Sequence, residues 1–369
     1  MNRDDRPIDL YRKILEWIDA GRSFAAAVVL CAEGSTPQQP GARALIDAAG
    51  AIAGTVGGGW VEARAQAGAV EVCRAGRAVV LDMHLDNAAA EESGPICGGS
   101  MRILLDPTAA RHRECFARAA DALDQRRRGA LLTEICTATP GPDGPHTLVR
   151  VEWLPEEGIA SATGPPGPDT IRSCLERESP RLCVGETQGT QPALEVFVEP
   201  VVPRPLLLIA GGGHVGRELA GQAVRVGFDV IVLDDRPEFA DPGRFPAGVT
   251  ARSGNVAREL AALPMTPDTY VALVTRGHQH DAEALAACLR GPAGYVGMIG
   301  SRRKVSMIRK GLLESGLATE EEFDRVFAPI GLELGAVTVP EIAASIVAEL
   351  IAVRRLGAEA ARSGREVSP

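Results

Sequence analysis

The chain has 369 residues, of which 45% are hydrophobic and 24% charged, the proportions of a folded globular protein with room for two or three domains. Lys and Arg (39) against Asp and Glu (48) give a net charge of −9, which argues against a general binder of nucleic acid or anionic membranes. The eight cysteines form no CxxC pair or zinc-type cluster, and no apolar signal core or membrane-length run is present. We therefore expect a cytoplasmic protein with reduced thiols.

The first half of the chain mixes helix and strand patterns. Apolar side chains recur at helical spacing over residues 8–20, and residues 60–75 also indicate a helix. The runs typical of short strands are 24–31, 42–46, 51–56, 78–83, 101–105, 131–138, 147–153 and 194–198. The spacing predicts that 131–138 and 147–153 pair as antiparallel strands. We expect a separate N-terminal α+β domain over residues 1–200.

The second half alternates strands and helices regularly. It follows residues 199–205, where three prolines in seven residues suit an extended interdomain strap. The expected elements are strand 206–210, helix 215–226, strand 229–233, strand 270–275, helix 281–289, strand 295–299 and a last helix over 341–355. This alternation predicts an α/β domain over residues 201–369, with a Rossmann-like, doubly wound parallel sheet.

A glycine motif of the form G-x-G-x-x-G lies between the strand at 206–210 and the helix that follows it. Its residues are Gly211, Gly213, His214 and Gly216. Such glycines allow a tight turn, a close approach of phosphate, and tight packing of helix on strand. Asp234 and Asp235 end the next strand, where a carboxylate accepts from ribose hydroxyls. This predicts a nucleotide site that prefers NAD over NADP; the alternative is a Rossmann-like domain that has lost its nucleotide.

Two further segments follow predicted strands. Thr275, Arg276 and His278 lie at the carboxyl end of one strand, where ligands bind in open parallel sheets. With His280 and Asp281 they suggest acid–base or metal chemistry, or, more simply, a helix capped by Asp281 with His278 as a loop donor.

The second segment comprises Ser301, Arg302, Arg303 and Lys304. Lys304 is one of only three lysines, with Lys13 and Lys310. Cations at a helix start oppose the helix dipole, so we expect them to hold an anionic ligand; the alternative is a solvated helix start.

The N-terminal half has two glycine loops of its own. Gly57, Gly58 and Gly59 precede a helix that carries Glu62, and they form either a backbone cradle for an anion or simply a tight turn. Cys97 lies beside Gly98 on a second loop, where an accessible thiol can act as a soft metal ligand, a sulfur carrier or a nucleophile; the alternative is an inert cysteine.

Taken together, these segments resemble the XdhC/CoxI family, accessory proteins of molybdenum hydroxylases such as xanthine dehydrogenase. The matching segments occur in order along nearly the whole chain: 54–62, 97–99, 207–216, 275–278, 295–304, 328–335 and 340–350. The run Gly-Ser-Arg-Arg-Lys after a strand is specific, because it is no general feature of Rossmann folds.

The resemblance implies a cofactor chaperone rather than a metabolic enzyme. Such a protein would bind the molybdenum cofactor (molybdopterin), support the exchange of its oxo ligand for sulfur, and deliver it to an apo xanthine dehydrogenase-type hydroxylase. It would act as a homodimer and contact a cysteine desulfurase. Cys97 would contact the cofactor or handle sulfur. The pterin phosphate or a nucleotide would be held by the loop at 57–59, the loop at 211–216, or residues 301–304.

One departure from the family concerns Trp60, which stands where many relatives have a small residue or a second cysteine. It leaves Cys97 as the main thiol. Two other functions stay open from the residues alone. One is an NAD(P)-dependent oxidoreductase with His278 or His280 as acid–base group, and the other is a nucleotide-sensing regulatory protein.

Overall fold

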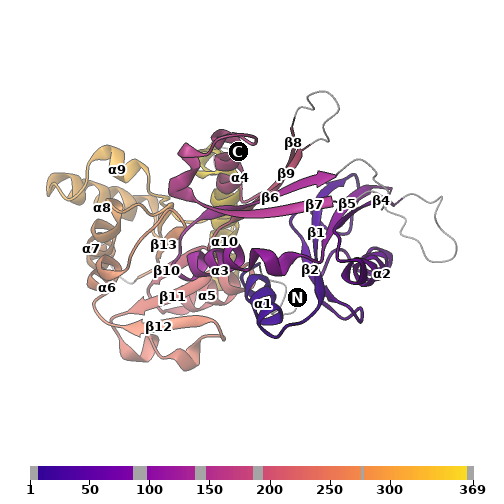
Figure 1. Cartoon of the computed structure of the whole chain (residues 1–369). Coiled ribbons are helices and arrows are strands. Elements are labelled where there is room, and N and C mark those ends of the chain that lie inside the picture. Colours follow the sequence, from indigo (N-terminus) through magenta and orange to yellow (C-terminus); the bar gives the residue numbers. More distant parts are fainter. Residues whose placement is uncertain (1–6, 86–97, 138–146, 186–193, 276–277, 364–369) are drawn as a thin grey trace. The chain divides into compact units, whose positions relative to one another are not determined.

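The computed structural model describes residues 7–85, 98–137, 147–185, 194–275 and 278–363. The chain forms two compact units, residues 1–203 and 204–369, called here the N-terminal and C-terminal units (Figure 1). None of the helices in these ranges is long and apolar enough to cross a membrane.

The N-terminal unit contains two antiparallel sheets and several helices. One sheet has the strand order β3-β2-β1-β5-β4 and the other the order β7-β6-β9-β8. The strands are β1 (Phe24–Glu33), β2 (Arg43–Asp47), β3 (Ile52–Gly54), β4 (Val79–His84), β5 (Ser100–Asp106), β6 (Gly129–Thr137), β7 (Thr147–Pro155), β8 (Arg181–Val184) and β9 (Leu194–Val201). The helices are α1 (Pro7–Asp19), α2 (Gly59–Ala75), α3 (Arg113–Asp124) and α4 (Pro168–Glu176). The pairing of β6 with β7 confirms the predicted antiparallel pair.

Strand β1 is apolar and buried over residues 24–30 because both of its faces are covered there. Ala25, Ala27 and Val29 pack in one hydrophobic cluster with residues of α2. Phe24 and Ala26 belong to a second cluster with residues of α1 and α3. Successive side chains of a strand point to opposite faces, so a strand between two layers needs no polar side. Residues 55–58 after β3 and residues 98–99 before β5 therefore lie at the margin of this sheet.

The predicted interdomain strap is wrong in its first three residues. Glu199, Pro200 and Val201 continue β9 and pair with β6. Pro200 lies past the last residue pair between β9 and β8, so among the described strands β9 has a neighbour, β6, on one side only at this point. A proline fits there because no strand on the other side needs a backbone N–H donor from it.

The C-terminal unit confirms the predicted Rossmann-like fold. Its strands are parallel and lie in the order β12-β11-β10-β13-β14, which is the order 3-2-1-4-5 of a doubly wound sheet. The strands are β10 (Leu206–Ala210), β11 (Asp229–Asp234), β12 (Val249–Ser253), β13 (Thr269–Leu273) and β14 (Tyr295–Met298). The helices are α5 (His214–Arg225), α6 (Val256–Ala262), α7 (His278–Leu289), α8 (Arg302–Glu314), α9 (Glu320–Asp324), α10 (Val339–Leu356) and α11 (Ala358–Ser363). Strand β12 and helix α6 were absent from the sequence prediction, because β12 (VTARS) is short and mostly polar.

Helices cover both faces of this sheet. Helices α5 and α10 pack together on one face, where Leu219 and Leu350 share a hydrophobic cluster (Figure 1). Helices α7 and α8 contribute Leu285 and Ile308 to the cluster on the other face. With both faces buried, the sheet leaves its edge at the carboxyl ends of the strands as the place for a ligand.

Candidate functional site

A cavity of about 320 Å³ lies at the carboxyl ends of the C-terminal strands. It opens where β10 neighbours both β11 and β13, the point at which the strand order reverses and at which ligands bind in such sheets. Its lining residues are Gly211, Gly213, Asp234, Asp235, Arg236, Asn255, Val256, Ala257, Val274, Thr275 and Glu283. Five of the predicted site residues therefore meet at one cavity: Gly211, Gly213, Asp234, Asp235 and Thr275.

The glycines of the first turn have the geometry that their spacing predicts. Gly211 has φ +111°, where a side chain would be strained, and a Cβ there would lie 2.8 Å from the Val274 carbonyl oxygen. A Cβ on Gly216 would lie 1.8 Å from the carbonyl oxygen of Gly211, so helix and strand pack too closely for any side chain. A Cβ on Gly213 would meet nothing within 4 Å. The open space at Gly213 is where a phosphate could approach the backbone.

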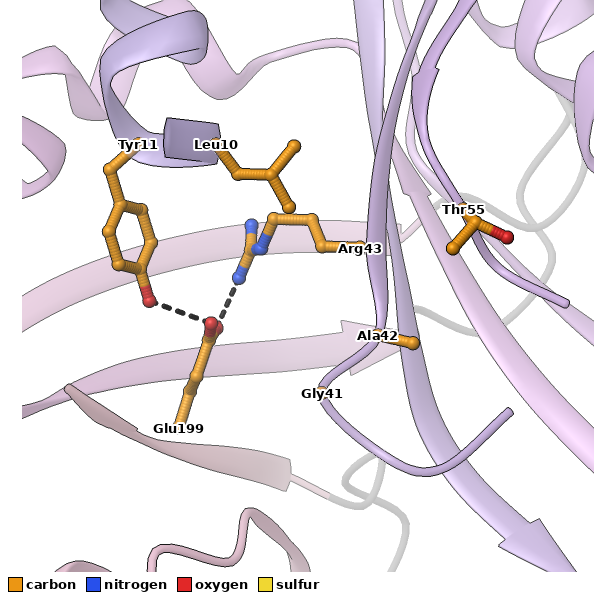
Figure 2. A pocket seen from close by; sticks show the side chains of 7 residues that line it. All are labelled: Leu10, Tyr11, Gly41, Ala42, Arg43, Thr55 and Glu199. Carbon is orange, nitrogen blue, oxygen red and sulfur yellow. Dashed lines mark hydrogen bonds and ion pairs between the residues drawn. The ribbon is translucent and has the colours of Figure 1, made fainter. Parts of the chain in front are cut away.

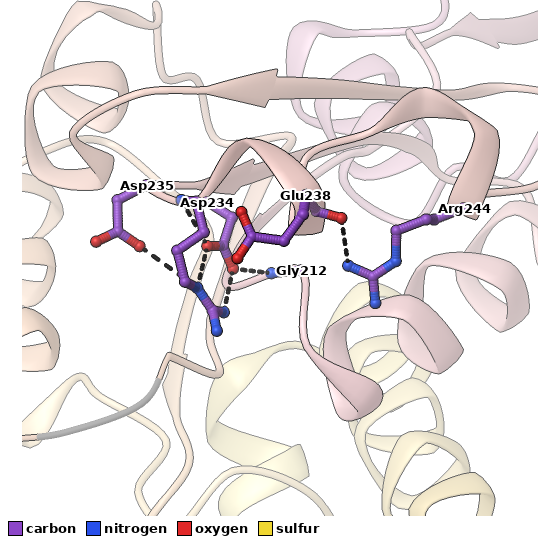
Figure 3. Close-up of polar contacts among 6 residues, drawn as sticks. Gly212, Asp234, Asp235, Glu238 and Arg244 are labelled. Carbon is purple, nitrogen blue, oxygen red and sulfur yellow. Dashed lines mark hydrogen bonds and ion pairs between the residues drawn. The ribbon is translucent and has the colours of Figure 1, made fainter.

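Asp234 is buried, at 2% exposure, and its carboxylate is already fully engaged. Figure 3 shows it facing Gly212, whose N–H donates to Oδ2 at 2.7 Å. Arg236 donates three further bonds: its backbone N–H at 3.0 Å and Nε at 2.8 Å, both to Oδ1, and Nη2 at 2.8 Å to Oδ2. Burial alone would raise the pKa of Asp234, but these bonds from Arg236 and Gly212 outweigh it and lower the pKa.

Arg236, which the sequence analysis missed, lies at the centre of this network. Its guanidinium rests on the ring of Phe239, 3.6 Å from the ring centroid. Its Nη1 is buried and has no hydrogen-bond partner among the described residues. Asp235 is 57% exposed, and one of its carboxylate oxygens lies 3.8 Å from Arg236 Nε, so it borders the buried network from the solvent side (Figure 3). Arg236 directly follows the two aspartates in the sequence, and a cation at that position could have suggested a partner for Asp234 within the protein.

Thr275 and Lys304, which were both expected to contact a ligand, instead contact the same protein side chain, Asp281. This aspartate is fully buried in the first turn of α7 and accepts from the Thr275 hydroxyl on one oxygen. Its other oxygen pairs with the ammonium of Lys304. Asp281 therefore does not act as a helix cap, and the positive charge of Lys304 has a partner within the protein. The pair ties the start of α7 to the start of α8.

The other predicted residues lie outside the cavity lining or outside the described residues. Ser301 caps α8 by accepting from the Lys304 N–H at 3.3 Å, and Arg302 and Arg303 are exposed. This arrangement matches the solvated helix start that the sequence also allowed. His214, the first residue of α5, is exposed. Arg276 lies outside the described residues, as do the side chains of His278 and His280 in the first turn of α7.

In the N-terminal unit the loop before α2 has an unusual backbone. Gly57, Gly58 and Gly59 all have positive φ, at 139°, 68° and 53°. A Cβ on Gly58 or Gly59 would meet nothing within 4 Å, and no described side chain caps the helix at Gly58. The Glu62 carboxylate accepts from the Thr55 hydroxyl, and the Gly57 N–H donates to that same hydroxyl at 3.2 Å. The first amides of α2 thus border open space beside a carboxylate that already has a partner.

A segment that the sequence analysis did not single out, residues 34–37, joins the two N-terminal glycine loops. Ser35 forms a parallel bridge with Gly98, and a Cβ on Gly99 would lie 2.5 Å from the Ser35 carbonyl oxygen. At its other end, Pro37 lies so close to Gly57 that a Cβ there would come within 2.8 Å of its ring. The loops at 57–59 and 98–99 therefore flank one segment. Cys97 directly precedes Gly98 in sequence but lies outside the described residues.

A second, smaller cavity in the N-terminal unit, of about 160 Å³, borders a buried polar cluster. Figure 2 shows Tyr11 and Arg43 both reaching Glu199, with the Tyr11 hydroxyl donating to Oε1 at 2.7 Å and Arg43 donating to Oε2. Burial, and then the neighbouring charge of Glu199, raise the pKa of Tyr11. Burial would lower the pKa of Arg43, but the same carboxylate outweighs it and raises the pKa.

Each of the two units contains a region that matches a known protein family. The family described as the XdhC and CoxI family matches residues 17–83, and the XdhC Rossmann domain matches residues 207–350. The chain belongs to the XdhC and CoxI family. The resemblance drawn from the motifs is thereby confirmed, with the glycine loop at 57–59 in one matched region and the cavity of the C-terminal unit in the other.

Three relatives of known sequence or structure illustrate the similarity. A Bacillus subtilis protein described as a probable xanthine dehydrogenase subunit is 24% identical over 331 residues, which are 89% of this chain and 92% of that protein. The uncharacterized protein YqeB of Escherichia coli is 39% identical over 165 residues, and the match spans 44% of this chain and only 30% of YqeB. A crystal structure described as a xanthine dehydrogenase from Bacillus halodurans superposes with a TM-score of 0.67, at 22% identity, over 97% of this chain and 98% of that one. The last similarity confirms the fold.

Proposed function

We propose that this protein is an accessory chaperone of a xanthine dehydrogenase-type molybdenum hydroxylase. It binds the molybdenum cofactor, supports its sulfuration and delivers it to the apo-enzyme. The support comes from the two XdhC family matches in one chain and from a relative with a xanthine dehydrogenase name that aligns over 89% of this chain. The same proposal includes a homodimer and a cysteine desulfurase as sulfur donor.

The observation that carries the proposal is the convergence of the two N-terminal glycine loops on residues 34–37. Backbone amides of Gly58 and Gly59 border open space at the start of α2, which suits a phosphate group. Gly98 forms a bridge with Ser35, and Cys97 directly precedes it in the sequence. When bound, molybdopterin supplies a phosphate and a metal held by two sulfur atoms, and a thiolate is a ligand that such a metal accepts.

The cofactor itself is the first test. The protein is purified under anaerobic conditions from a host that makes molybdopterin, and small molecules released from it are identified by mass spectrometry. We expect about one molybdopterin for each binding site, and its absence from correctly folded protein would contradict the proposal.

A matched pair of variants tests the loop before α2. Gly59 and Gly76 lie at the two ends of this helix, with φ of 53° and 66° and open space around a Cβ. Aspartate tolerates such left-handed φ values better than most residues, whereas Gly58, with ψ 172°, is in a region that glycine alone adopts readily. We expect Gly59→Asp to lower pterin content at least tenfold through repulsion of the phosphate, and Gly76→Asp to leave it unchanged. Equal pterin content in both variants would place the phosphate elsewhere.

Sulfur handling is tested through the client enzyme. We expect Cys97→Ala to retain pterin but to yield hydroxylase with an unsulfurated, inactive cofactor, whereas Cys136→Ala on β6 serves as the control. Cyanide-releasable sulfur of the client is the measurement. Normal sulfuration with Cys97→Ala would remove this thiol from the mechanism.

Sedimentation of the purified protein, alone and mixed with the desulfurase, tests the two association proposals. A monomer at micromolar concentration, or two species that sediment independently, would contradict the corresponding one.

A further inference from the structure

Gly213 lies at the end of the C-terminal cavity that borders the start of α5. This glycine lines the cavity, directly precedes α5 and has no atom near the position of a Cβ. Its φ of −66° is open to any residue, so backbone strain does not explain a glycine there. The space that its missing side chain leaves is at the N-terminus of a 12-residue helix. A pyrophosphate group fits this position through its charge and its acceptors.

The two aspartates that follow one another at the end of β11 differ in the hydrogen-bond acceptor sites that they leave open. A carboxylate has about four sites at which it accepts hydrogen bonds. In Asp234 the N–H of Gly212 and three N–H groups of Arg236 take four of them. Asp235 follows directly, is more than half exposed and lines the same cavity. Its carboxylate lies 3.8 Å from Arg236 Nε and keeps acceptor sites for a pair of ribose hydroxyls, whereas those of Asp234 are occupied.

The charge around this end selects against a phosphorylated ribose. The charged residues among those that line the cavity are Asp234, Asp235, Glu283 and Arg236, so three carboxylates stand against one guanidinium. The guanidinium of Arg236 is committed to Asp234 on two of its nitrogens. An arginine in this region accommodates a 2′-phosphate only when its charge is not already balanced. Here a phosphate on the ribose would face a net negative charge.

The remaining lining suits the flat face of a base. Val256, Ala257 and Val274 give apolar surface on the side of β12 and β13. The planar guanidinium of Arg236 is held in place by the ring of Phe239 and by Asp234, and such a surface stacks on aromatic rings.

We propose that the C-terminal unit binds the adenosine diphosphate moiety of a nucleotide whose ribose hydroxyls are both free, as in ADP-ribose or NAD. Gly213 admits the pyrophosphate, Asp235 accepts from the ribose hydroxyls, and Arg236 stacks on the base. This ligand is additional to the molybdenum cofactor, because the residues that read it belong to the other unit. The protein thereby responds to two ligands, one in each unit.

Calorimetric titration of the full-length protein with ADP-ribose, NAD and NADP tests the proposal. We expect ADP-ribose and NAD to bind with similar affinity and NADP to bind at least tenfold more weakly. Asp235→Asn should weaken ADP-ribose about tenfold or more, the loss of hydrogen bonds to a charged acceptor, and should narrow the gap between NAD and NADP. Tighter binding of NADP than of NAD, or binding of none of the three, would overturn the proposal.

A second pair of variants distinguishes a loss of nucleotide binding from a loss of folding. Gly213 and Gly311 both have open space around a Cβ, and Gly311 lies on α8 away from the cavity lining. We expect Gly213→Val to abolish ADP-ribose binding and Gly311→Val to preserve it, with both proteins folded by circular dichroism. If Gly213→Val binds normally, the pyrophosphate does not lie at this turn.

Pterin content, measured on the same samples, separates this proposal from the proposed function. Loss of ADP-ribose binding in Gly213→Val with unchanged pterin supports two independent ligands. Loss of both would mean that one ligand occupies this cavity, and it would overturn the separate nucleotide site. ADP-ribose binding by a protein that never contains pterin would support the nucleotide site while contradicting the chaperone.

Discussion

Each unit contains a buried carboxylate paired with an arginine, and the two pairs differ in what they connect. Arg43 and Glu199 are 156 positions apart in sequence, and their side chains are 6% and 10% exposed. Asp234 and Arg236 are two positions apart, and the arginine is 25% exposed at the rim of a cavity. The first pair joins β2 of one sheet to β9 of the other. The second pair fixes the conformation of one turn beside the cavity. A buried pair of carboxylate and guanidinium can thus either join distant parts of a core or shape a candidate binding site.

The largest effect is expected from breaking the pair in the core. Arg43→Met leaves Glu199 buried with the Tyr11 hydroxyl but without its cationic partner, and we expect the N-terminal unit to lose about 3–5 kcal/mol of unfolding free energy. All three tryptophans, Trp17, Trp60 and Trp153, belong to this unit, so their fluorescence in a urea titration reports its unfolding. Lys13→Met, which removes an exposed ion pair with Glu16, is the control and should cost under about 1 kcal/mol. Equal losses of unfolding free energy in the two variants would mean that the buried pair stabilises the unit no more than an exposed one.

A smaller effect is expected in the C-terminal pair, and it depends on pH. The pKa of Asp234 is lowered in the folded protein from its ordinary value of 3.8. Its contribution is therefore present above about pH 4 and is lost as the pH falls through the lower, folded pKa. Asp234→Asn should cost about 2–3 kcal/mol at pH 7 and should remove this part of the acid sensitivity.

Hydrogen exchange of peptides from β10 and β11, measured from pH 7 down to pH 3, follows this prediction in the C-terminal unit. Asp235→Asn is the matched neighbour, because its carboxylate is exposed and makes none of the buried hydrogen bonds. Stability that declines in acid equally in wild type and Asp234→Asn would show that other carboxylates dominate.

The smallest effect is expected from a third pair, intermediate in burial. Lys304 is 24% exposed and its partner Asp281 is fully buried. We expect Lys304→Met to cost about 1–2 kcal/mol, because water reaches part of the site and compensates for the lost ammonium. Adding Asp281→Asn should recover part of the loss. Lys310→Met, from the exposed pair with Glu314, should be nearly neutral in the same thermal unfolding measurement.

The sequence predicted the local parts of this molecule well. Strand runs such as 206–210 and the glycine turn at 211–216 depend on neighbours in the chain, and the structure has both. The Rossmann-like sheet followed from the alternation of strands and helices. The short strand β12 was missed, because its polar residues give no apolar pattern.

The pairing of charged side chains could not be predicted in the same way. Spacing brought Asp234 to the cavity but did not reveal that Arg236 folds back on it and leaves Asp235 to face a ligand. The three basic residues at 302–304 suggested an anion, whereas Lys304 found its partner in Asp281 on another helix. Glu199 was hidden in a proline-rich segment that resembled a linker. The last two depend on which chain segments meet in space, and the first depends on the conformation of a single turn.

The contact between Arg43 and Glu199 also has a consequence for synthesis on the ribosome. The arginine emerges 156 residues before the carboxylate that neutralises it. At ~5–20 residues per second, it waits about 8–30 s for its partner. Strand β2 therefore carries a charge bound for the core through most of the translation of its unit. The contact that this pair makes between the two sheets therefore forms only after residue 199 has left the exit tunnel.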